Sequence, residues 1–303
     1  MNENPQSDRT EATDEPLRPL LFSLAYRMVG SVTEAEDLVQ ETLLRVHRAE
    51  RDGVVIESRR PYSCAVVTRL SIDHLRSARV RREEYVGEWL PEPIVTDPSL
   101  DPAAHAELAD SLSMAFLVLL ETLTPPERAV LLLRDVFGFG FDEVAELIDK
   151  TEDNTRQIAS RARRRVAEGK PRFEASVQRR WALAERFFAA VDGGDPDALV
   201  AMLAEDATMY GDGGGVAAAR RVPVQGGAAV ARFLHNLGVR GRCDGLRLTL
   251  MDVNGQPGAV AHDPEGRTVA VMALDIVDGR VQTVRSVVNP DKLGHVGAAQ
   301  GRP

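Results

Sequence analysis

The stretch TPPERAVLLLRDVFGFGFDEVAELIDKTEDNTRQIASRARRRV, residues 124–166, decides the fold of the middle of the chain. Its first four residues combine a threonine N-cap, a proline at the first helical position and a glutamate that completes a capping box. A short helical segment at 142–148 and a turn of three residues then lead into a last helix that begins at Glu152. Two helices joined by such a turn are typical of a helix-turn-helix, so we expect that motif here.

The last helix of this motif has two different faces, and the inward one is uncharged: Thr155, Ile158, Ala159, Ala162 and Val166. Its outward positions are mostly basic, and no acidic residue occurs from 155 to 166. Such a face suits a major groove, with arginines on phosphates and Arg156 or Gln157 near base edges. The alternative is a solvated face of a surface helix, which the excess of arginines without any acid and the preceding turn disfavour. The predicted DNA contacts are Arg156, Gln157, Ser160, Arg161 and Arg164.

A second basic helix precedes this motif. Pro61 stands near the start of a helical pattern that continues to about Arg82, where a missing N–H is tolerated. Between residues 58 and 82 one acid, Asp73, stands among seven arginines. Two basic surfaces on separate helical segments suggest one ligand that contacts both of them. DNA is the natural candidate. The predicted contacts are Arg59, Arg60, Arg69, Arg76 and Arg79.

Helical spacing also marks the N-terminal part of the chain. Apolar residues from Leu17 onward follow a helical period that Gly30 ends. Thr33 and Glu36 form the signature of a capping box, so we expect the second helix to begin there. Asp52-Gly53 is expected to end it.

The pattern of the sequence changes twice after these helices. Four prolines without a helical period mark residues 88–102 as an extended linker. Beyond Gly169-Lys170-Pro171, one or two helices precede β-branched runs separated by Asn254-Gly255 and Asp278-Gly279. Such dipeptides between β-branched runs are strong hairpin signals. The expected fold is multidomain, with two all-α modules followed by an α+β domain.

Composition narrows the classes of function. The 303 residues carry a formal net charge of −9, so any nucleic-acid contact must come from local basic patches. Cys64 and Cys243 lie far apart, which excludes a disulfide framework and a cysteine-based zinc site, and both are expected to be buried. No apolar run approaches the ~18 residues of a membrane span, so we expect a cytoplasmic protein. No metal and no cofactor is expected.

Taken in order, these segments resemble the extracytoplasmic-function (ECF) group of bacterial RNA polymerase sigma factors, within the sigma-70 family. RPLLFSLAYRMVGSVTEAEDLVQETLLRV (18–46) is similar to region 2.1–2.2, RPYSCAVVTRLSIDHLRSARVRRE (60–83) to regions 2.3–2.4, and residues 124–166 to region 4. The resemblance implies that the protein binds core RNA polymerase and directs promoter-specific transcription initiation. It assigns the −10 element to the first basic helix and the −35 element to the helix-turn-helix.

The same resemblance implies the partners within the polymerase, which are the β′ coiled coil and the β flap. The acidic, polar run in the second helix looks like the contact with the β′ coiled coil. Its residues are Asp37, Leu38, Val39, Gln40 and Glu41.

The end of the chain resembles one subgroup of this family, in which a SnoaL-like cone of the NTF2 type follows region 4. The resemblance rests on WLPEP (89–93), Asp-Gly-Gly-Gly (212–215) and NPDKL (289–293). It implies that this domain regulates the sigma modules in cis, and contact of the last two motifs with WLPEP is one geometry that would do so. The expected regulatory contacts are Trp89, Leu90, Pro91, Glu92, Pro93, Asp212, Gly213, Gly214, Gly215, Asn289, Pro290, Asp291, Lys292 and Leu293.

The expected organisation follows from these segments. It comprises a tail (1–16), sigma region 2 as a helical bundle (17–86), a linker (87–108), sigma region 4 (109–170), the SnoaL-like domain (177–293) and a tail (294–303).

Two other readings remain open. One is a DNA-binding regulator whose SnoaL-like domain binds or converts a small molecule. Conversion would need a base in a pocket. Its candidates are His235, Asp206, Tyr210, His262 and Asp275. No pair of these residues has a spacing that indicates a catalytic base with its partner, so we expect no enzymatic activity. A small molecule that binds in the same pocket without reacting is consistent with the sequence. A repressor independent of polymerase would leave the run at 37–41 unexplained.

Overall fold

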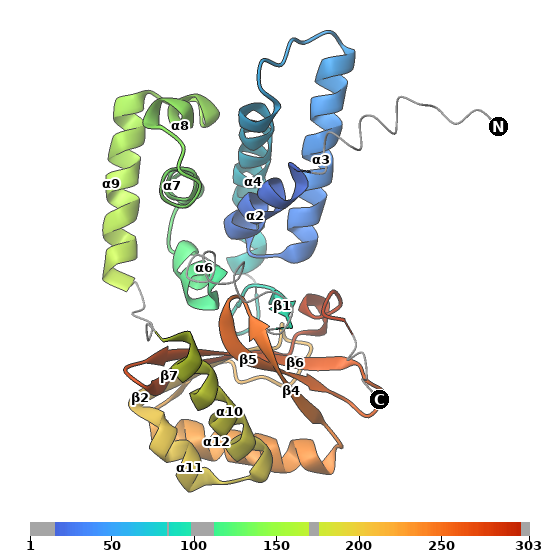
Figure 1. Ribbon diagram of the computed structural model, residues 1–303, viewed down its shortest axis with the longest axis vertical. Helices are drawn as coiled ribbons and strands as arrows, with labels where there is room; N and C mark the ends of the chain where they lie inside the picture. Colours follow the sequence, from blue (N-terminus) through green and yellow to red (C-terminus); the bar gives the residue numbers. More distant parts are fainter. Residues whose placement is uncertain (1–15, 84, 98–111, 170–175, 298–303) are drawn as a thin grey trace, which may run out of the picture. The chain divides into compact units, whose positions relative to one another are not determined.

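The computed structural model describes residues 16–83, 85–97, 112–169 and 176–297 (Figure 1). The chain forms two compact units. The first comprises Met1–Glu83 with Leu119–Gly169, and the second comprises Glu84–Val118 with Lys170–Pro303. The linker expected from the sequence therefore belongs to the same unit as the C-terminal domain.

The N-terminal half of the first unit is a bundle of α2 (Arg18–Val29), α3 (Val32–Arg51) and α4 (Arg59–Glu83). As expected, Gly30 ends α2, and its φ of 73° is the left-handed conformation that glycine adopts without strain. The predicted cap of α3 is wrong. Ser31, and not Thr33, is the N-cap, because its hydroxyl accepts the N–H of Glu34 at 3.1 Å. Thr33 is an exposed residue of the first turn.

The other half of the first unit contains the expected helix-turn-helix. It consists of α7 (Pro125–Leu131), a π-helical turn (Leu132–Val136), α8 (Phe141–Leu147) and α9 (Glu152–Gly169). The predicted capping box is confirmed, because the carboxylate of Glu127 accepts from the N–H of Thr124 at 3.0 Å and from its hydroxyl at 2.8 Å. Four of the five residues of the predicted inward face of α9, Thr155, Ile158, Ala159 and Ala162, are buried, and Val166 is half-buried.

The described part of the second unit contains a mixed sheet of seven strands in the order β1-β4-β5-β6-β7-β2-β3. Their bounds are β1 (Val95–Thr96), β2 (Leu203–Asp212), β3 (Val224–Gln225), β4 (Arg247–Val253), β5 (Gln256–His262), β6 (Thr268–Val277) and β7 (Arg280–Val287). Strands β2 and β7 are parallel, and the other pairs are antiparallel.

Both hairpins expected from the sequence are present. Asn254 and Gly255 connect β4 to β5, and Asp278 and Gly279 connect β6 to β7. All four residues have positive φ, between 50° and 74°, which is the signature of a type I′ turn. The linker supplies β1, which pairs with β4 so that Val95 faces Val253. The sequence predicted only that this part of the linker is extended.

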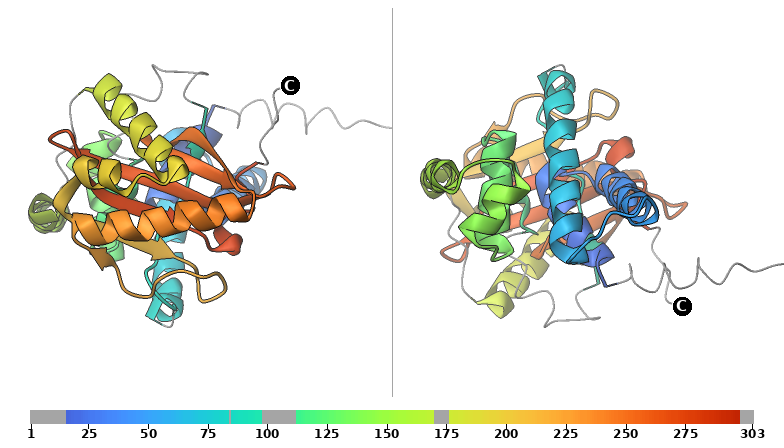
Figure 2. Two further views of the ribbon diagram at one scale, coloured as in Figure 1. Left: turned by 90° about the horizontal axis from the view of Figure 1, so that it is seen from below. Right: turned by 90° about the horizontal axis from the view of Figure 1, so that it is seen from above.

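Three helices cover one face of the sheet: α10 (Val177–Gly193), α11 (Pro196–Met202) and α12 (Gly227–Cys243). Figure 2 shows α12 crossing that face, and the core beneath includes Phe187, Leu234 and Met272. Cys243 is exposed because it is the last residue of α12, so its predicted burial is wrong, whereas Cys64 is buried.

A second core occupies the opposite face of the sheet. Leu90 from the linker and Met114 from α6 (Met114–Leu120) pack there against Val260 and Val287, together with Leu293. The linker therefore closes the second apolar face of the C-terminal domain.

Candidate functional site

A carboxylate at the end of β2 binds the linker to the C-terminal domain. Asp212 is fully buried. Its Oδ2 accepts the backbone N–H of Leu90 at 2.8 Å and the ammonium of Lys292 at 2.7 Å. Its Oδ1 accepts the hydroxyl of Tyr85 and the N–H of Gly214. All its strong acceptor sites thus face protein donors, which a buried carboxylate requires.

Lys292 completes this arrangement from the C-terminal side. Its ammonium also donates to the carbonyl of Leu90 at 2.5 Å. The same nitrogen lies 4.4 Å from the ring centroid of Trp89 and 4.9 Å from that of Tyr85. Carboxylate, carbonyl and two aromatic faces together compensate its desolvation. Tyr85, Leu90, Asp212, Asn289 and Lys292 are called the linker clamp below.

Asn289 is the N-cap of the short 3-10 turn Pro290–Lys292, which follows strand β7. Its side-chain amide donates to the hydroxyl of Tyr85 at 3.0 Å, and its own N–H donates to the carbonyl of Asp212 at 3.0 Å. Gly214 lies against it with a φ of 59°, and a Cβ at that position would overlap the Asn289 amide. Gly214 is therefore required by both conformation and space. Burial and the hydrogen bond to Asp212 raise the pKa of the Tyr85 hydroxyl.

Further residues fix the linker beyond the clamp. His295 donates from Nε2 to the carbonyl of Pro93 at 2.8 Å. Asn254 exchanges two hydrogen bonds with Ile94, of 2.9 and 3.0 Å, and its side chain donates to the carbonyl of Leu112 at 3.1 Å. Contacts of Asn254 thus hold the chain at Ile94 and again at Leu112.

The structure brings the three predicted regulatory motifs together. Trp89, Leu90, Asp212, Gly214, Asn289 and Lys292 meet in the contacts above, and Pro91, Glu92, Pro93 and Leu293 are buried nearby. Gly213 is buried, Gly215 is exposed, and Pro290 and Asp291 form the 3-10 turn. Sequence reasoning missed Tyr85, Asn254 and His295. Asn254 was recognised only as a turn residue, and no motif marks the other two.

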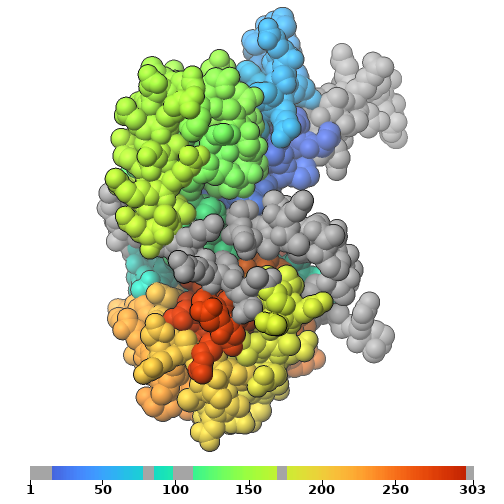
Figure 3. All heavy atoms as spheres, turned by 60° about the vertical axis from the view of Figure 1, so that its left-hand side comes forward, coloured from blue at the N-terminus to red at the C-terminus, as the bar shows by residue number. Residues whose placement is uncertain are grey.

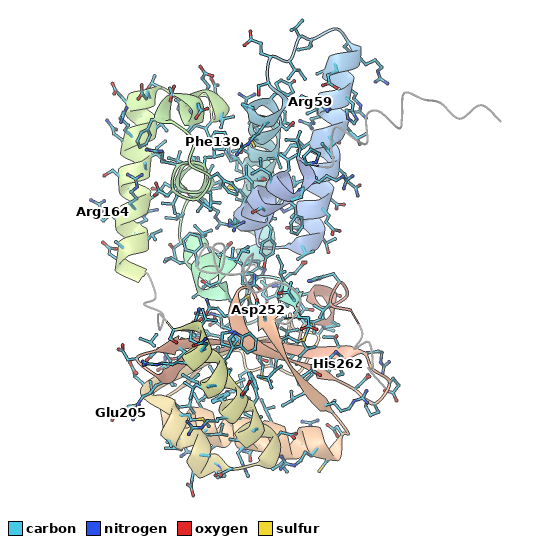
Figure 4. The ribbon with its side chains drawn as sticks, viewed as in Figure 1. Arg59, Phe139, Arg164, Glu205, Asp252 and His262 are labelled. Carbon is cyan, nitrogen blue, oxygen red and sulfur yellow. The ribbon has the colours of Figure 1, made fainter. Side chains whose placement is uncertain are left out.

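The outward face of α9 presents the predicted −35 residues to solvent. Arg164 projects away from α7 (Figure 4), and Gln157 and Ser160 are exposed on the same helix. Arg156 stacks over Phe141 at 4.5 Å and pairs with Glu152, which orients its guanidinium. Arg161 lies 3.9 Å from Glu127. Figure 3 shows the outer surface formed by α7, α8 and α9.

The predicted polymerase-binding run of α3 divides into two faces. Leu38 and Val39 are buried in the bundle, which leaves Asp37, Gln40 and Glu41 accessible. Glu41 accepts a hydrogen bond from Arg45 at 2.6 Å. Leu44 is 49% exposed at helical spacing from Gln40 and Glu41 and was missed, because the family motif ends before it.

The predicted −10 residues lie along α4. Arg59 pairs with Glu50 at 2.9 Å, Arg76 pairs with Asp73 at 3.3 Å, and Arg60 is exposed. The side chain of Arg79 lies outside the described residues.

Arg69 differs from the other −10 residues, because it contacts the helix-turn-helix within the first unit. It donates to the backbone carbonyls of Glu146 and Leu147 at the end of α8, each at 3.3 Å. Arg128 of α7 makes the reciprocal contact, donating to the carbonyl of Met28 at 2.5 Å. Burial lowers the pKa of Arg128 to about 9. The two predicted DNA-binding segments are therefore packed together in this structure.

A cavity of about 260 Å³ lies between α12 and the sheet of the second unit. Its walls are mainly apolar and include Leu234, Ala261, Met272 and Val288. None of the candidate bases His235, Asp206, Tyr210, His262 and Asp275 lines it. Among the described side chains there is no group of three or more acids, histidines or cysteines suited to a metal. None of the described helices has the length and apolar character for a membrane crossing.

Comparisons with known proteins agree with this organisation. Three family models match: Sigma-70 region 2 (15–81), Sigma-70 region 4 (113–166) and a SnoaL-like domain (184–288). The ECF RNA polymerase sigma factor SigJ of Mycobacterium tuberculosis is 38% identical over 290 residues, which is 92% of this chain and 91% of SigJ. The chain belongs to the ECF sigma factors.

Two further comparisons place this ECF sigma factor more closely. The probable ECF sigma factor SigI of M. tuberculosis is 33% identical over 306 residues, covering 98% of this chain and 99% of SigI. The crystal structure of M. tuberculosis SigJ matches with a TM-score of 0.73 at 35% identity, covering 93% of this chain and 97% of that one. Helical sigma regions followed by a SnoaL-like domain with a mixed sheet are thus shown, and the ECF sigma factor acts in promoter-directed transcription initiation with RNA polymerase and promoter DNA.

Proposed function

We propose that the SnoaL-like domain controls this sigma factor in cis by holding the linker between regions 2 and 4. The observation that carries the proposal is the double contact of Leu90, whose N–H and C=O bind Asp212 and Lys292. Backbone contacts of this kind fix the path of the linker whatever its side chains. When regions 2 and 4 take up new positions, the linker between them must follow a new path. Its attachment to the SnoaL-like domain therefore limits the positions that the two regions can reach.

The physical cost of releasing the linker is substantial. Release would expose the buried pair Asp212–Lys292 and the apolar contact of Leu90. Release would also break the two hydrogen bonds between the Leu90 backbone and this charged pair, and a hydrogen bond to a charged group contributes ~1.5–3 kcal/mol. The attachment is therefore a stable state of the domain, and a partner or ligand that changes it must supply comparable free energy.

Run-off transcription with purified core polymerase tests this control. The full chain carrying Asp212→Ala is compared with wild type and with Asp206→Ala, which removes an exposed carboxylate from the same strand. We expect Asp212→Ala to change transcript yield several-fold from the same start site, and the direction shows whether the domain activates or inhibits. Equal yields from all three proteins, with Asp212→Ala folded, would overturn the proposal.

We also propose that the exposed face of α3, Asp37, Gln40 and Glu41 together with Leu44, binds the β′ coiled coil, while region 4 contacts the β flap. The acidic, partly apolar character of this face supports the first contact. In a pull-down with core polymerase, the double variant Asp37→Ala/Glu41→Ala should lose binding. The control Glu36→Ala/Glu57→Ala removes two other exposed acids and should retain it. Equal retention would contradict the assignment.

The DNA contacts are assigned in the same way. We propose that Arg156, Gln157, Ser160, Arg161 and Arg164 read the −35 element and that the arginines of α4 read the −10 element. Exposure of these residues on one side of α9 supports the first assignment. The contact of Arg69 with α8 means that this side chain must leave the carbonyls of Glu146 and Leu147 before it reaches DNA.

A second candidate role for the SnoaL-like domain is the binding of a small molecule, and the cavity of about 260 Å³ favours it. Catalysis is a weaker candidate, because the candidate bases do not line the cavity. We therefore propose a binding domain without a reaction of its own.

A further inference from the structure

The cavity of the SnoaL-like domain and the linker clamp share one piece of backbone. Ser286 and Val288, at and just beyond the end of β7, line the cavity. The N–H of Val288 donates to the carbonyl of Asp212 at 2.8 Å, and the next residue is Asn289. A molecule in the cavity would therefore contact the same segment that positions Asp212 and Asn289.

The chemistry of the cavity walls defines what they can bind. Leu234, Ala261, Met272 and Val288 form an apolar interior, and Ser286 contributes a buried hydroxyl. The charged lining residues, Asp192 and Arg242, are exposed, and Arg242 donates to the backbone carbonyl of Asp192. A charged ligand group within these walls would lose its hydration without a buried partner of opposite charge.

The size of the cavity sets a second limit. Its volume is about 260 Å³. Apolar cavities of about 150 Å³ stay dry and take up benzene. A molecule with one or two rings, or an aliphatic one of similar size, therefore fits.

We propose that this cavity binds a neutral, largely apolar molecule of one or two rings, and that its occupancy changes the linker clamp through Val288 and Asn289. The proposal rests on the cis control described above, because it identifies the signal to which the clamp responds. The ligand packs on Ser286 and Val288 and restricts the segment between β7 and the 3-10 turn. The position of Asn289 then sets the hydrogen bond to Tyr85 and the contact with Asp212.

Trp89 provides the readout, because its ring lies against the ammonium of Lys292. The chain has two tryptophans, and Trp181→Phe leaves Trp89 as the reporter. Toluene is titrated into the full chain carrying this substitution, and sodium benzoate, the same ring with a charge, is titrated in parallel. We expect toluene to bind with a saturable change in Trp89 emission whose midpoint agrees with calorimetry, and benzoate to bind about tenfold more weakly or not at all.

Cavity-filling variants separate this site from other apolar surfaces. Ala261→Leu and Ala270→Leu each add bulk to the wall and should weaken toluene binding by about tenfold or more. Ala228→Leu adds the same bulk to an exposed position of α12 and should leave binding unchanged. Equal toluene binding by folded filled variants and wild type, or tighter binding of benzoate, would overturn the proposed site.

Two further outcomes separate the parts of the proposal. Toluene binding without any change in Trp89 emission would overturn the coupling to the clamp. Run-off transcription by Asp212→Ala provides the independent reference: if that variant changes transcript yield while toluene does not bind, the cavity proposal fails and the cis control stands. If Asp212→Ala leaves the yield unchanged, the cis control itself fails.

Discussion

The ammonium nitrogen of Lys292 lies 2.7 Å from Oδ2 of Asp212, and the two side chains are 9% and 0% exposed. The pair joins the end of β2 to the turn that follows β7, and the backbone of Leu90 forms a hydrogen bond with each of the two side chains. A linker segment is thus bound by an ion pair of the domain that follows it in the chain.

Lys292→Met should destabilise the C-terminal domain strongly, because it leaves the Asp212 carboxylate buried without its cation. The expected loss is ~3–5 kcal/mol in the free energy of unfolding, measured by denaturant unfolding followed by circular dichroism. Arg240→Met is the control, because its pair with Asp244 is 3.7 Å long and its side chain is 79% exposed. That change should cost less than ~1 kcal/mol. Similar losses in both variants would contradict the role of the buried pair.

Gly214→Ala should release Asn289 from Tyr85, because the added Cβ would occupy the space of the Asn289 amide. Gly266→Ala is the matched control, since Gly266 also has positive φ but nothing lies within 4 Å of its Cβ position. Both changes should cost about 1–2 kcal/mol from backbone conformation alone. Only Gly214→Ala should add a further loss and shift the emission of Trp89. An unshifted spectrum would show that the glycine is not needed for the clamp.

Arg164→Ala should weaken promoter binding by the holoenzyme, because Arg164 faces outward on α9. A lost hydrogen bond between charged groups corresponds to ~1.5–3 kcal/mol, measured as promoter affinity at fixed salt. Arg165→Ala is the control, because that guanidinium donates to Glu127 at 2.7 Å within the protein. If Arg165→Ala reduced affinity as much as Arg164→Ala, the assigned recognition face would be wrong.

The stability of the C-terminal domain should fall in mildly acidic solution. Burial and, next, the charge of Arg247 lower the pKa of His262, while Asp263 opposes them. The unfolded chain therefore binds a proton at a higher pH than the folded domain. The free energy of unfolding should fall as the pH decreases from about 6.5, the ordinary histidine value, toward the lower folded value. His262→Gln should reduce this slope, as measured by thermal unfolding between about pH 5 and pH 8.

Local signals predicted much of the fold. The Asp278-Gly279 and Asn254-Gly255 turns and the capping box at Thr124 and Glu127 all depend on residues a few positions apart. The failure at the start of α3 is also local. Ser31 and Thr33 can both cap a helix, and the sequence does not show which hydroxyl reaches an N–H.

For the linker, the sequence predicted which motifs contact each other but not the individual hydrogen bonds. Asn254, Tyr85 and His295 act through partners 142 to 204 residues away, which leave no spacing in the sequence. At 37–41, by contrast, the family motif predicted more contact residues than the helix exposes. The family motif includes Leu38 and Val39, but the helical period places these two inside the bundle.

Amide exchange of Leu90 in the free, full-length protein tests the linker attachment most directly. The Leu90 N–H donates to a fully buried carboxylate. Exchange should therefore be slowed by about a hundredfold or more relative to an unstructured chain, and Asp212→Ala should remove that protection while Asp206→Ala preserves it. Exchange of Leu90 at the unstructured rate in the wild-type protein would contradict a linker held by the SnoaL-like domain.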